Sequence, residues 1–289
     1  MIRTGKARIA AIIGWPVAHS RSPALHGYWL DKYGIDGAMV PLAVAPGDLE
    51  LVLRALPRMG MVGGNLTLPH KEAALTLVDE ADETARVIGA INTLVVGKGG
   101  RLLGSNTDGG GFIAHVKASV PDWRPQAGPA TVLGAGGAAR AIAYALAGAG
   151  VPRLVLVNRT RERAAALASA LSAASKAQIE AVAWRDRAEA IAGAALLVNT
   201  TSLGMSGQPP LDIALDRLGR DAVVADIVYS PLETDLLRRA TARGHKTVDG
   251  LGMLIHQARP GFAAWFGREP EVTGELVAHL TGALEGECG

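Results

Sequence analysis

A glycine-rich segment with the pattern GxGxxA follows a short apolar run and precedes an alanine-rich stretch. The segment is Gly134–Ala139, and the apolar run before it is Thr131–Leu133. In a strand–turn–helix unit the first glycine permits a sharp turn, the second lets the backbone approach a pyrophosphate, and the third small residue lets the helix pack on the strand. The free N–H groups of the first helical turn then face the phosphates. The pattern predicts a dinucleotide site at Gly134, Ala135, Gly136, Gly137 and Ala138.

The residues after the next apolar run indicate which dinucleotide this site accepts. An NAD site usually has Asp or Glu about 20 residues further on for the ribose 2′-hydroxyl, whereas an NADP site has arginine for the 2′-phosphate. Here Leu154–Val157 is followed by Asn158-Arg159-Thr160, with no carboxylate at that point. A planar guanidinium suits a phosphate. We therefore predict NADP as the cofactor, bound at this end by Asn158, Arg159, Thr160 and Arg163.

The elements that must position these residues follow an α/β pattern in both halves of the chain. In the first half we expect strands over Arg8–Ile13, Ala38–Val44, Met61–Leu66 and Thr93–Val96, and helices after Pro23, where Ser22 could cap, and over Leu49–Arg58 and Lys71–Val78. In the second half we expect strands over Thr131–Leu133, Leu154–Val157, Ile179–Ala183, Leu196–Asn199 and Ala222–Ile227, with helices such as Arg161–Ser172. The second half is therefore predicted to be a Rossmann-like, doubly wound domain.

Length and connectivity predict two α/β domains. The 289 residues exceed the roughly 100–200 of a typical single domain. Two helical segments, Leu254–Trp265 and Thr273–Leu284, have no following strand, so we expect them to pack back on the first domain. The proline-containing segment Ser119–Pro129 has the composition of a linker. We assign 1–108 with 250–289 to the first domain and 109–249 to the second.

Composition narrows the class of partner. The net charge is +2 and Lys and Arg are scattered, which argues against a nucleic-acid partner and favours a small molecule. Cys288, the single cysteine, has no partner for an intramolecular disulfide, and no signal-peptide pattern precedes the first strand. The seven histidines show no metal-ligand spacing, so no metal is expected, and His19 and His70 are interpreted as structural. We expect a soluble, cytoplasmic protein without membrane contact.

Motifs along nearly the whole chain resemble, in order, those of the shikimate dehydrogenase family. In the first half they are Gly14–Pro23 (GWPVAHSRSP), Asn65–Lys71 (NLTLPHK), Ala90–Thr93 (AINT) and Gly104–Gly109 (GSNTDG). In the second half they are Gly134–Ala138, Asn158–Thr160, Tyr229–Thr234 (YSPLET) and Asp249–Met253 (DGLGM). The resemblance implies reversible reduction of 3-dehydroshikimate to shikimate by NADPH in aromatic amino acid biosynthesis, by a monomer or a homodimer, with the first domain binding the substrate.

The resemblance also implies roles for individual residues. Hydride delivery to a ketone leaves an alkoxide that needs a proton. Lys71 is the expected donor and Asp108 its partner near the same hydroxyl, and which of the two carries the transferred proton stays open. The expected substrate contacts are Ser20, Ser22, Thr67, Lys71, Asn92, Asp108, Tyr229 and Gln257. The further cofactor contacts are Glu83, Ile227 and Gly250, and Ile227 departs from the methionine that often stands at its position.

Other functions are compatible with parts of the pattern. A quinate/shikimate dehydrogenase would also accept quinate and often favours NAD; Arg159 opposes NAD, but quinate stays open. A non-catalytic, NADP-sensing protein would have no use for Lys71 together with Asp108. A methyltransferase can use a glycine-rich turn, but it would favour an acidic residue where Asn158-Arg159 stands.

Overall fold

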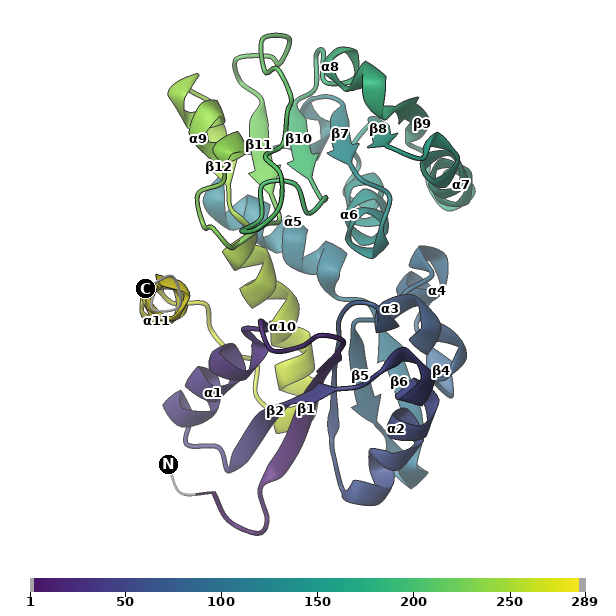
Figure 1. Cartoon of the computed structure of the whole chain (residues 1–289), viewed down its shortest axis with the longest axis vertical. Coiled ribbons are helices and arrows are strands. Elements are labelled where there is room, and N and C mark those ends of the chain that lie inside the picture. The colour runs from purple at the N-terminus through teal and green to yellow at the C-terminus, as the bar shows by residue number, and fades with distance from the viewer. Residues whose placement is uncertain (1–2, 286–289) are drawn as a thin grey trace. The chain divides into compact units, whose positions relative to one another are not determined.

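The chain forms a six-stranded sheet in each of two units (Figure 1). The computed structural model describes residues 3–285. Unit 1 is formed by the chain up to Thr107 together with the chain from Gln257 onward, and unit 2 by Asp108–His256. The chain therefore passes from one unit to the other at two points.

The sheet of unit 1 is parallel except for one strand. Its order is β2-β1-β3-β5-β6-β4, and only β5 runs antiparallel to its neighbours. The strands are β1 (Arg8–Gly14), β2 (Gly37–Ala43), β3 (Gly63–Leu66), β4 (Glu80–Ala81), β5 (Thr93–Val96) and β6 (Leu102–Ser105). The apolar residues of β1 are almost wholly buried, as expected of a strand covered on both faces.

Helices cover both faces of this sheet. One face packs on the segments after β2 and β3, through a core that includes Leu49, Leu53 and Leu56. The other face packs on helices from opposite ends of the chain. The helices of unit 1 are α1 (Ser22–Lys32), α2 (Leu49–Ala55), α3 (His70–Ala73), α4 (Glu83–Ile88), α11 (Gly274–Glu285) and the second part of α10 (Gly250–Phe266).

An aromatic cluster joins the C-terminal helices to the start of the chain. Trp29 and Trp265 are fully buried, and Trp265 Nε1 donates to the Leu94 carbonyl of β5 at 2.7 Å. Trp29 Nε1 donates to the Glu271 carbonyl at 3.0 Å. His26 lies among these rings, and burial lowers its pKa to about 3, so it is neutral. The prediction that the C-terminal helices pack on the first domain is confirmed.

The sheet of unit 2 is wholly parallel and has the Rossmann strand order. The order is β12-β11-β10-β7-β8-β9, so the direction of winding reverses between β7 and β10. The strands are β7 (Ala130–Leu133), β8 (Arg153–Asn158), β9 (Gln178–Ala183), β10 (Leu196–Asn199), β11 (Val223–Asp226) and β12 (Lys246–Val248). The predicted doubly wound domain is confirmed.

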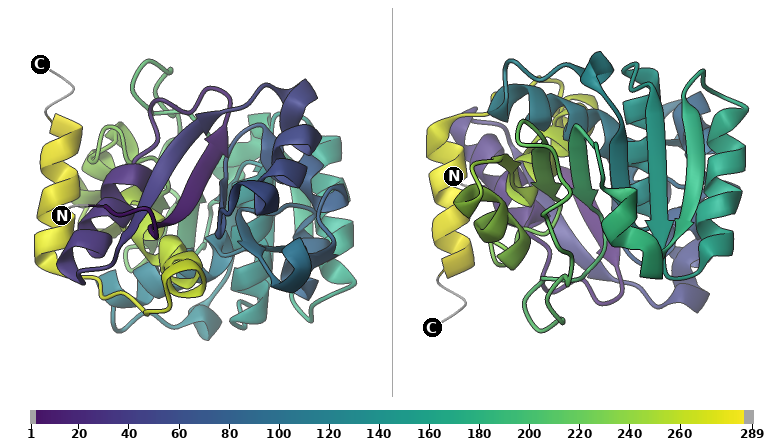
Figure 2. Two further views of the ribbon diagram at one scale, coloured as in Figure 1. Left: turned by 90° about the horizontal axis from the view of Figure 1, so that it is seen from below. Right: turned by 90° about the horizontal axis from the view of Figure 1, so that it is seen from above.

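Helices lie on both sides of the unit 2 sheet (Figure 2). One apolar core joins β7, β8, β10 and β11 to α9 and to the long connection before β11, which contributes Leu211 and Ile213. The helices of unit 2 are α5 (Asp108–Ser119), α6 (Gly137–Gly148), α7 (Arg161–Ser172), α8 (Arg187–Ala190), α9 (Asp235–Ala242) and the first part of α10. Among the described residues no helix has both the length and the apolar character to span a bilayer.

Several predicted elements differ from the structure. The short strands β4, β6 and β12 were not predicted, because two to four residues carry no recognisable period. The helix predicted over Lys71–Val78 is only α3 followed by a 3₁₀ turn. Ser119–Pro129 connects α5 to β7 inside unit 2, so it is not a linker between units. The second division of the chain falls inside the continuous helix α10, seven residues beyond the predicted boundary at 249/250. Cys288 lies outside the described residues.

Replacing Trp265 by phenylalanine tests the attachment of α10 to the unit 1 sheet. Trp265→Phe removes the hydrogen bond from Nε1 to the Leu94 carbonyl and opens a cavity, so we expect the free energy of unfolding to fall by about 2–3 kcal/mol. Urea unfolding followed by circular dichroism measures this change. Trp15→Phe is the control, because Trp15 is 51% exposed and its substitution should change stability by less than about 0.5 kcal/mol. Equal effects of the two substitutions would contradict the assignment.

Candidate active site

The polar residues predicted in unit 1 follow or precede strands at one edge of its sheet. β1, β3 and β6 run in the same direction, so their carboxyl ends share an edge, and the antiparallel β5 begins there. Thr67 directly follows β3, and Asn92 directly precedes β5. The strand directions thus bring residues that are far apart in sequence to the same side of unit 1.

Asn92 and Gln257 are joined by a buried hydrogen-bond network. Asn92 Nδ2 donates to Gln257 Oε1 at 3.2 Å and to Thr107 Oγ1 at 3.0 Å. Asn92 Oδ1 accepts the backbone N–H of Thr107 at 2.9 Å, and Thr107 Oγ1 donates to the Gln257 carbonyl at 2.8 Å. The network fixes the orientation of the Asn92 amide. Thr107 was not predicted, although it lies inside the motif Gly104–Gly109, because a threonine beside an aspartate gives no signal of its own.

Asn65 holds the backbone of Asn92 from the neighbouring strand. Its Nδ2 donates to the Asn92 carbonyl at 3.1 Å and to Thr93 Oγ1 at 3.3 Å, and all three residues are buried. The backbone N–H of Leu66 donates to the same carbonyl at 2.8 Å. Asn92 is therefore fixed at its backbone and at its side chain.

Lys71 is the second residue of the short helix α3, whose position is fixed by its neighbours. The buried His70 donates through Nε2 to the Val44 carbonyl at 2.8 Å, beyond the end of β2. The Lys71 carbonyl accepts the backbone N–H of Ile91 at 2.8 Å. The histidine thus has the structural role that was predicted, and it anchors the turn that carries Lys71.

Ser20 and Ser22 are held close to each other at the start of α1. Arg21, which lies between the two serines, has helical angles, φ −88° and ψ −2°. Ser22 is the first residue of α1, so the expected cap by its side chain is wrong. Instead, Ser20 Oγ accepts the backbone N–H of Ser22 at 3.3 Å. The bond holds the Ser20 hydroxyl at the first turn of α1.

The glycine turn in unit 2 fits a pyrophosphate. Gly134 has φ +118°, and a Cβ there would lie 2.5 Å from Thr200 Oγ1, so only glycine suits this position. Around Gly136 and Gly137 a Cβ would meet no atom within 4 Å, so the space beside this turn is free. The buried Ala139 packs α6 against the sheet. These residues have the conformation and the free space that an NADP pyrophosphate requires.

The end of β8 presents the predicted 2′-phosphate residues. Asn158 Nδ2 donates to the Thr160 carbonyl at 2.9 Å, which shapes the turn before α7. Arg159 and Arg163 are exposed, and within the described residues neither forms an ion pair. Their guanidinium groups are therefore accessible to an anion from solvent.

The remaining predicted cofactor residues are divided between the units. Ile227 follows β11, and a Cβ at Gly250 would collide with the Ile227 carbonyl, so these two backbones touch. Asp249 Oδ1 accepts the backbone N–H of Gly252 at 3.1 Å and lies 3.5 Å from His115 Nε2 of α5. Burial raises the pKa of Asp249, but these hydrogen bonds outweigh burial and the pKa is lowered overall. Glu83 is the first residue of α4 in unit 1.

Comparison with known proteins identifies the family. Residues 12–94 match the family model of the shikimate dehydrogenase substrate binding domain, and residues 120–205 match that of shikimate / quinate 5-dehydrogenase. A protein of Paramagnetospirillum magneticum named shikimate dehydrogenase (NADP(+)) is 60% identical over 277 residues, 96% of this chain and 99% of that protein. The chain belongs to the shikimate dehydrogenase family. The predicted resemblance is confirmed.

Solved structures of this family share the fold. Shikimate 5-dehydrogenase from Thermus thermophilus, in complex with NADP(H) and shikimate, has a TM-score of 0.82 and 37% identity, with 96% of this chain and 98% of that chain covered. Quinate dehydrogenase from Corynebacterium glutamicum, in complex with NAD, has a TM-score of 0.88 and 33% identity, with 96% and 99% covered. One shikimate dehydrogenase fold thus occurs with either dinucleotide.

A buried carboxylate at the end of β11 was not predicted. Asp226 is 1% exposed and accepts three hydrogen bonds, from Asn199 Nδ2, the Val228 N–H and Thr234 Oγ1. Burial raises its pKa to about 6, against the lowering effect of these three bonds. In the sequence only its place at the end of the run Val223–Ala225, with Thr234 eight residues further on, distinguishes it from an ordinary strand-end aspartate.

The raised pKa of Asp226 predicts a pH dependence of stability in this protein. A carboxyl group with a raised folded-state pKa stabilises the fold most below its unfolded pKa near 4, and this contribution is lost as the pH rises to about 6. As the pH rises from 4 to 6, the wild type should therefore lose roughly 2–3 kcal/mol of unfolding free energy relative to Asp226→Asn, since each pKa unit corresponds to about 1.4 kcal/mol.

Urea unfolding of both proteins at intervals from pH 4 to pH 7.5 measures this difference. All other titrating groups are common to the two proteins and cancel. The charged side chains of α9, Asp235, Arg238 and Arg239, form ion pairs with one another. Stability curves that stay parallel over the whole range would show that Asp226 is not the titrating group.

Proposed function

We propose that this chain catalyses the reversible, NADPH-dependent reduction of 3-dehydroshikimate to shikimate. The observation that carries the proposal is the gathering of Lys71 with a fixed amide and hydroxyl network, Asn92, Thr107 and Gln257, at one edge of the unit 1 sheet. We assign substrate binding to the N-terminal domain with the C-terminal helices, and NADP binding to the Rossmann-like domain, with 1–108 plus 250–289 and 109–249 as their ranges.

The substrate is a small ring with a carboxylate and several hydroxyl groups, and the side chains of unit 1 match this chemistry. An amide side chain carries both a hydrogen-bond donor and an acceptor, and each substrate hydroxyl can also donate and accept, so amides suit a ring with neighbouring hydroxyls. We propose that Thr67, Asn92 and Gln257 bind the hydroxyls. Ser20 and Ser22, at the first turn of α1, are proposed to bind the carboxylate together with Tyr229. Unit 1 then distinguishes a polyhydroxylated acid from an apolar ketone.

Lys71 is proposed as the group that exchanges the proton at the reacting oxygen. NADPH, when bound, supplies the hydride. The alkoxide that forms at the substrate carbon requires a proton, and an ammonium group in place supplies it without waiting for solvent. Asp108, the first residue of α5, is proposed as the catalytic partner of Lys71. In the reverse direction the same groups accept the proton of the substrate hydroxyl.

The cofactor preference is proposed to reside in the turn after β8. Asn158, Arg159, Thr160 and Arg163 are assigned to the 2′-phosphate end, and Gly134–Ala138 to the pyrophosphate. Glu83, Ile227 and Gly250 are assigned to the remainder of the cofactor. Arginine in place of a carboxylate favours NADP over NAD by charge alone.

Compartment and assembly belong to the proposal as well. We propose a cytoplasmic enzyme that works as a monomer or a homodimer. A single cysteine in 289 residues is compatible with a reducing compartment.

The test is a reduction assay of NADP⁺ and NAD⁺ with shikimate and with quinate, four rates in all, for the wild type and Arg159→Ala. We expect the pair of NADP⁺ and shikimate to be fastest in the wild type. Arg159→Ala should raise KM for NADP⁺ by at least about tenfold, the equivalent of about 1.4 kcal/mol, and leave KM for NAD⁺ nearly unchanged. A wild type that oxidises neither acid would overturn the proposed function, and equal losses for both dinucleotides would move the 2′-phosphate site elsewhere.

Removal of the Lys71 ammonium tests its catalytic role. Lys71→Ala should lower kcat by about 10²–10⁴-fold with a smaller effect on KM for shikimate, since general acid help is lost while most substrate contacts remain. Steady-state kinetics with NADP⁺ and shikimate measure both constants. Lys98→Ala, at an exposed turn of the same unit, is the control and should behave as the wild type. Near wild-type turnover of Lys71→Ala would remove Lys71 from the mechanism.

A further inference from the structure

Asp226 connects the ends of the segment that follows β11. Its Oδ1 accepts the Val228 N–H at 3.0 Å, near the start of this segment, and its Oδ2 accepts Thr234 Oγ1 at 2.7 Å, at the end. Ile227 and Tyr229, both assigned above to ligand binding, lie within it. The Ile227 N–H in turn donates to the Asn199 carbonyl at 3.1 Å. One buried side chain thus closes this segment into a loop.

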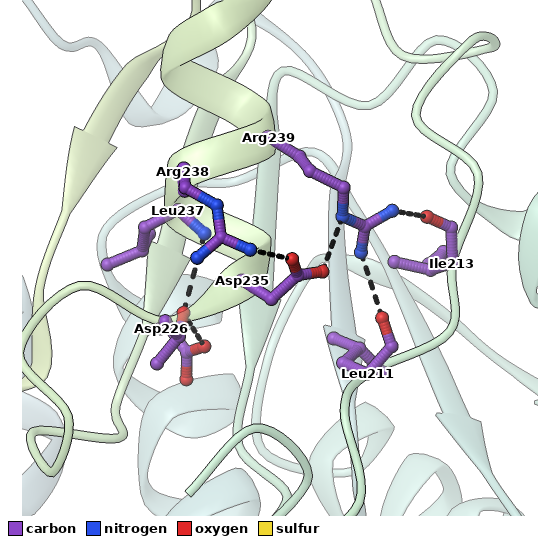
Figure 3. Close-up of polar contacts among 8 residues, drawn as sticks. Leu211, Ile213, Asp226, Asp235, Leu237, Arg238 and Arg239 are labelled. Atoms are coloured by element: carbon purple, nitrogen blue, oxygen red, sulfur yellow. Dashed lines mark hydrogen bonds and ion pairs between the residues drawn. The ribbon is translucent and has the colours of Figure 1, made fainter.

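The far end of the loop is attached to a helix that is itself fixed. Thr234 is the N-cap of α9 and accepts the Leu237 N–H at 3.4 Å. One turn further on, Arg239 donates to the carbonyls of Leu211 and Ile213 at 2.9 and 2.8 Å and pairs with Asp235 at 2.7 Å (Figure 3). In Figure 3, Asp226, the last residue of β11, lies beside the first turn of α9, and the contact between Asp235 and Arg239 is separate from it. The helix therefore gives Thr234 a position that does not depend on a ligand.

The same carboxylate is linked to the glycine turn through the end of β10. Asn199 Nδ2 donates to Asp226 Oδ1 at 2.9 Å, and Asn199 Oδ1 accepts the Thr201 N–H at 3.0 Å. Between them Thr200 donates through its N–H and Oγ1 to the Leu133 carbonyl, at 2.9 and 2.6 Å, directly before Gly134. Three strand ends of unit 2, those of β7, β10 and β11, are joined by this chain of bonds.

The chemistry of the side chain explains why a carboxylate occupies this position. Three donors converge on Asp226, and an ionised carboxylate accepts at both oxygens, whereas an amide accepts at only one. A buried carboxylate costs desolvation, and among the described residues three hydrogen bonds compensate it, because the charged residues of α9 pair with one another. If stability were the only requirement, an apolar residue of similar size would fill this space with a smaller loss of folding free energy.

We propose that Asp226 is a positioning residue, which with Asn199 and Thr234 holds the Ile227–Tyr229 segment in the conformation that receives the nicotinamide end of NADPH. The inference rests on the proposed function, because it takes Ile227 as a nicotinamide contact. Asp226 itself acts only through the backbone it holds. Loss of Asp226 then weakens binding of the nicotinamide part of the cofactor and leaves the adenine end, at the turn after β8, unaffected.

Two ligands separate these ends of the site. NADPH uses both ends, whereas adenosine 2′,5′-bisphosphate carries the adenine and 2′-phosphate and lacks the nicotinamide. For Asp226→Ala and Thr234→Val we expect Kd for NADPH to rise about tenfold or more by titration calorimetry, and Kd for adenosine 2′,5′-bisphosphate to stay within about twofold. Thr234→Ser restores the hydroxyl and should restore wild-type binding. If Asp226→Ala does not fold, the Thr234 pair carries the test.

Thr131→Val is the matched control. Thr131 is fully buried in the same sheet, and its Oγ1 donates to the Ala190 carbonyl at 2.8 Å, so the variant loses one buried hydrogen bond but none of this network. It should bind both ligands as the wild type does. Unchanged NADPH binding in Thr234→Val, or equal losses for both ligands, would overturn the inference and leave the proposed function standing. A wild type that binds no NADPH would overturn both.

Discussion

The direction of the strands is the constraint on which the rest of this structure depends. In unit 2 all strands are parallel, so every segment that follows a strand emerges at the same edge of the sheet. The glycine turn after β7, the turn with Arg159 after β8 and the segment with Ile227 after β11 therefore lie at this edge. Unit 1 achieves the same with one exception, because β5 runs backwards and delivers Asn92 at its start instead of its end. Residues separated by more than a hundred positions, such as Asn92 and Gln257, then meet.

Buried polar groups convert this shared edge into a defined geometry. Asn65 and Asn92 in unit 1, and Asn199 and Asp226 in unit 2, each form hydrogen bonds to a neighbouring strand end or to the segment beside it. A buried amide or carboxylate without partners costs several times what a hydrogen bond contributes, so such groups disfavour any alternative arrangement of the segments. The apolar cores determine that the sheets form, whereas these polar groups determine where the loop backbones lie.

The sequence predicted the elements whose physics is local. The strand before Gly134 and the helix after it were predictable because apolar runs, the left-handed turn and the small residue at Ala139 each leave a signature within a few positions. Thr107 and Asp226 were not predictable, because their roles depend on residues such as Gln257 and Asn199 that the fold brings to them. The cap expected from Ser22 was wrong although this contact is local, because Ser20, two residues earlier, supplies the oxygen for the first turn. The pairing of Lys71 with Asp108 stays a prediction.

The two crossings between the units have a consequence for the order of folding. Unit 2 is one uninterrupted segment of the chain. The unit 1 sheet, in contrast, is complete only when Trp265 has been synthesised and can bond to Leu94. Likewise Trp29 of α1 finds its hydrogen-bond acceptor only when Glu271 has been synthesised. During synthesis, which proceeds from the N-terminus, domains generally fold as units as they become complete. The first-made strands of this protein are therefore the last to acquire their full cover, and the α10 side of their sheet stays exposed while the ribosome makes the whole of unit 2. In this chain the oldest part is therefore the part whose apolar surface is exposed to aggregation for the longest time.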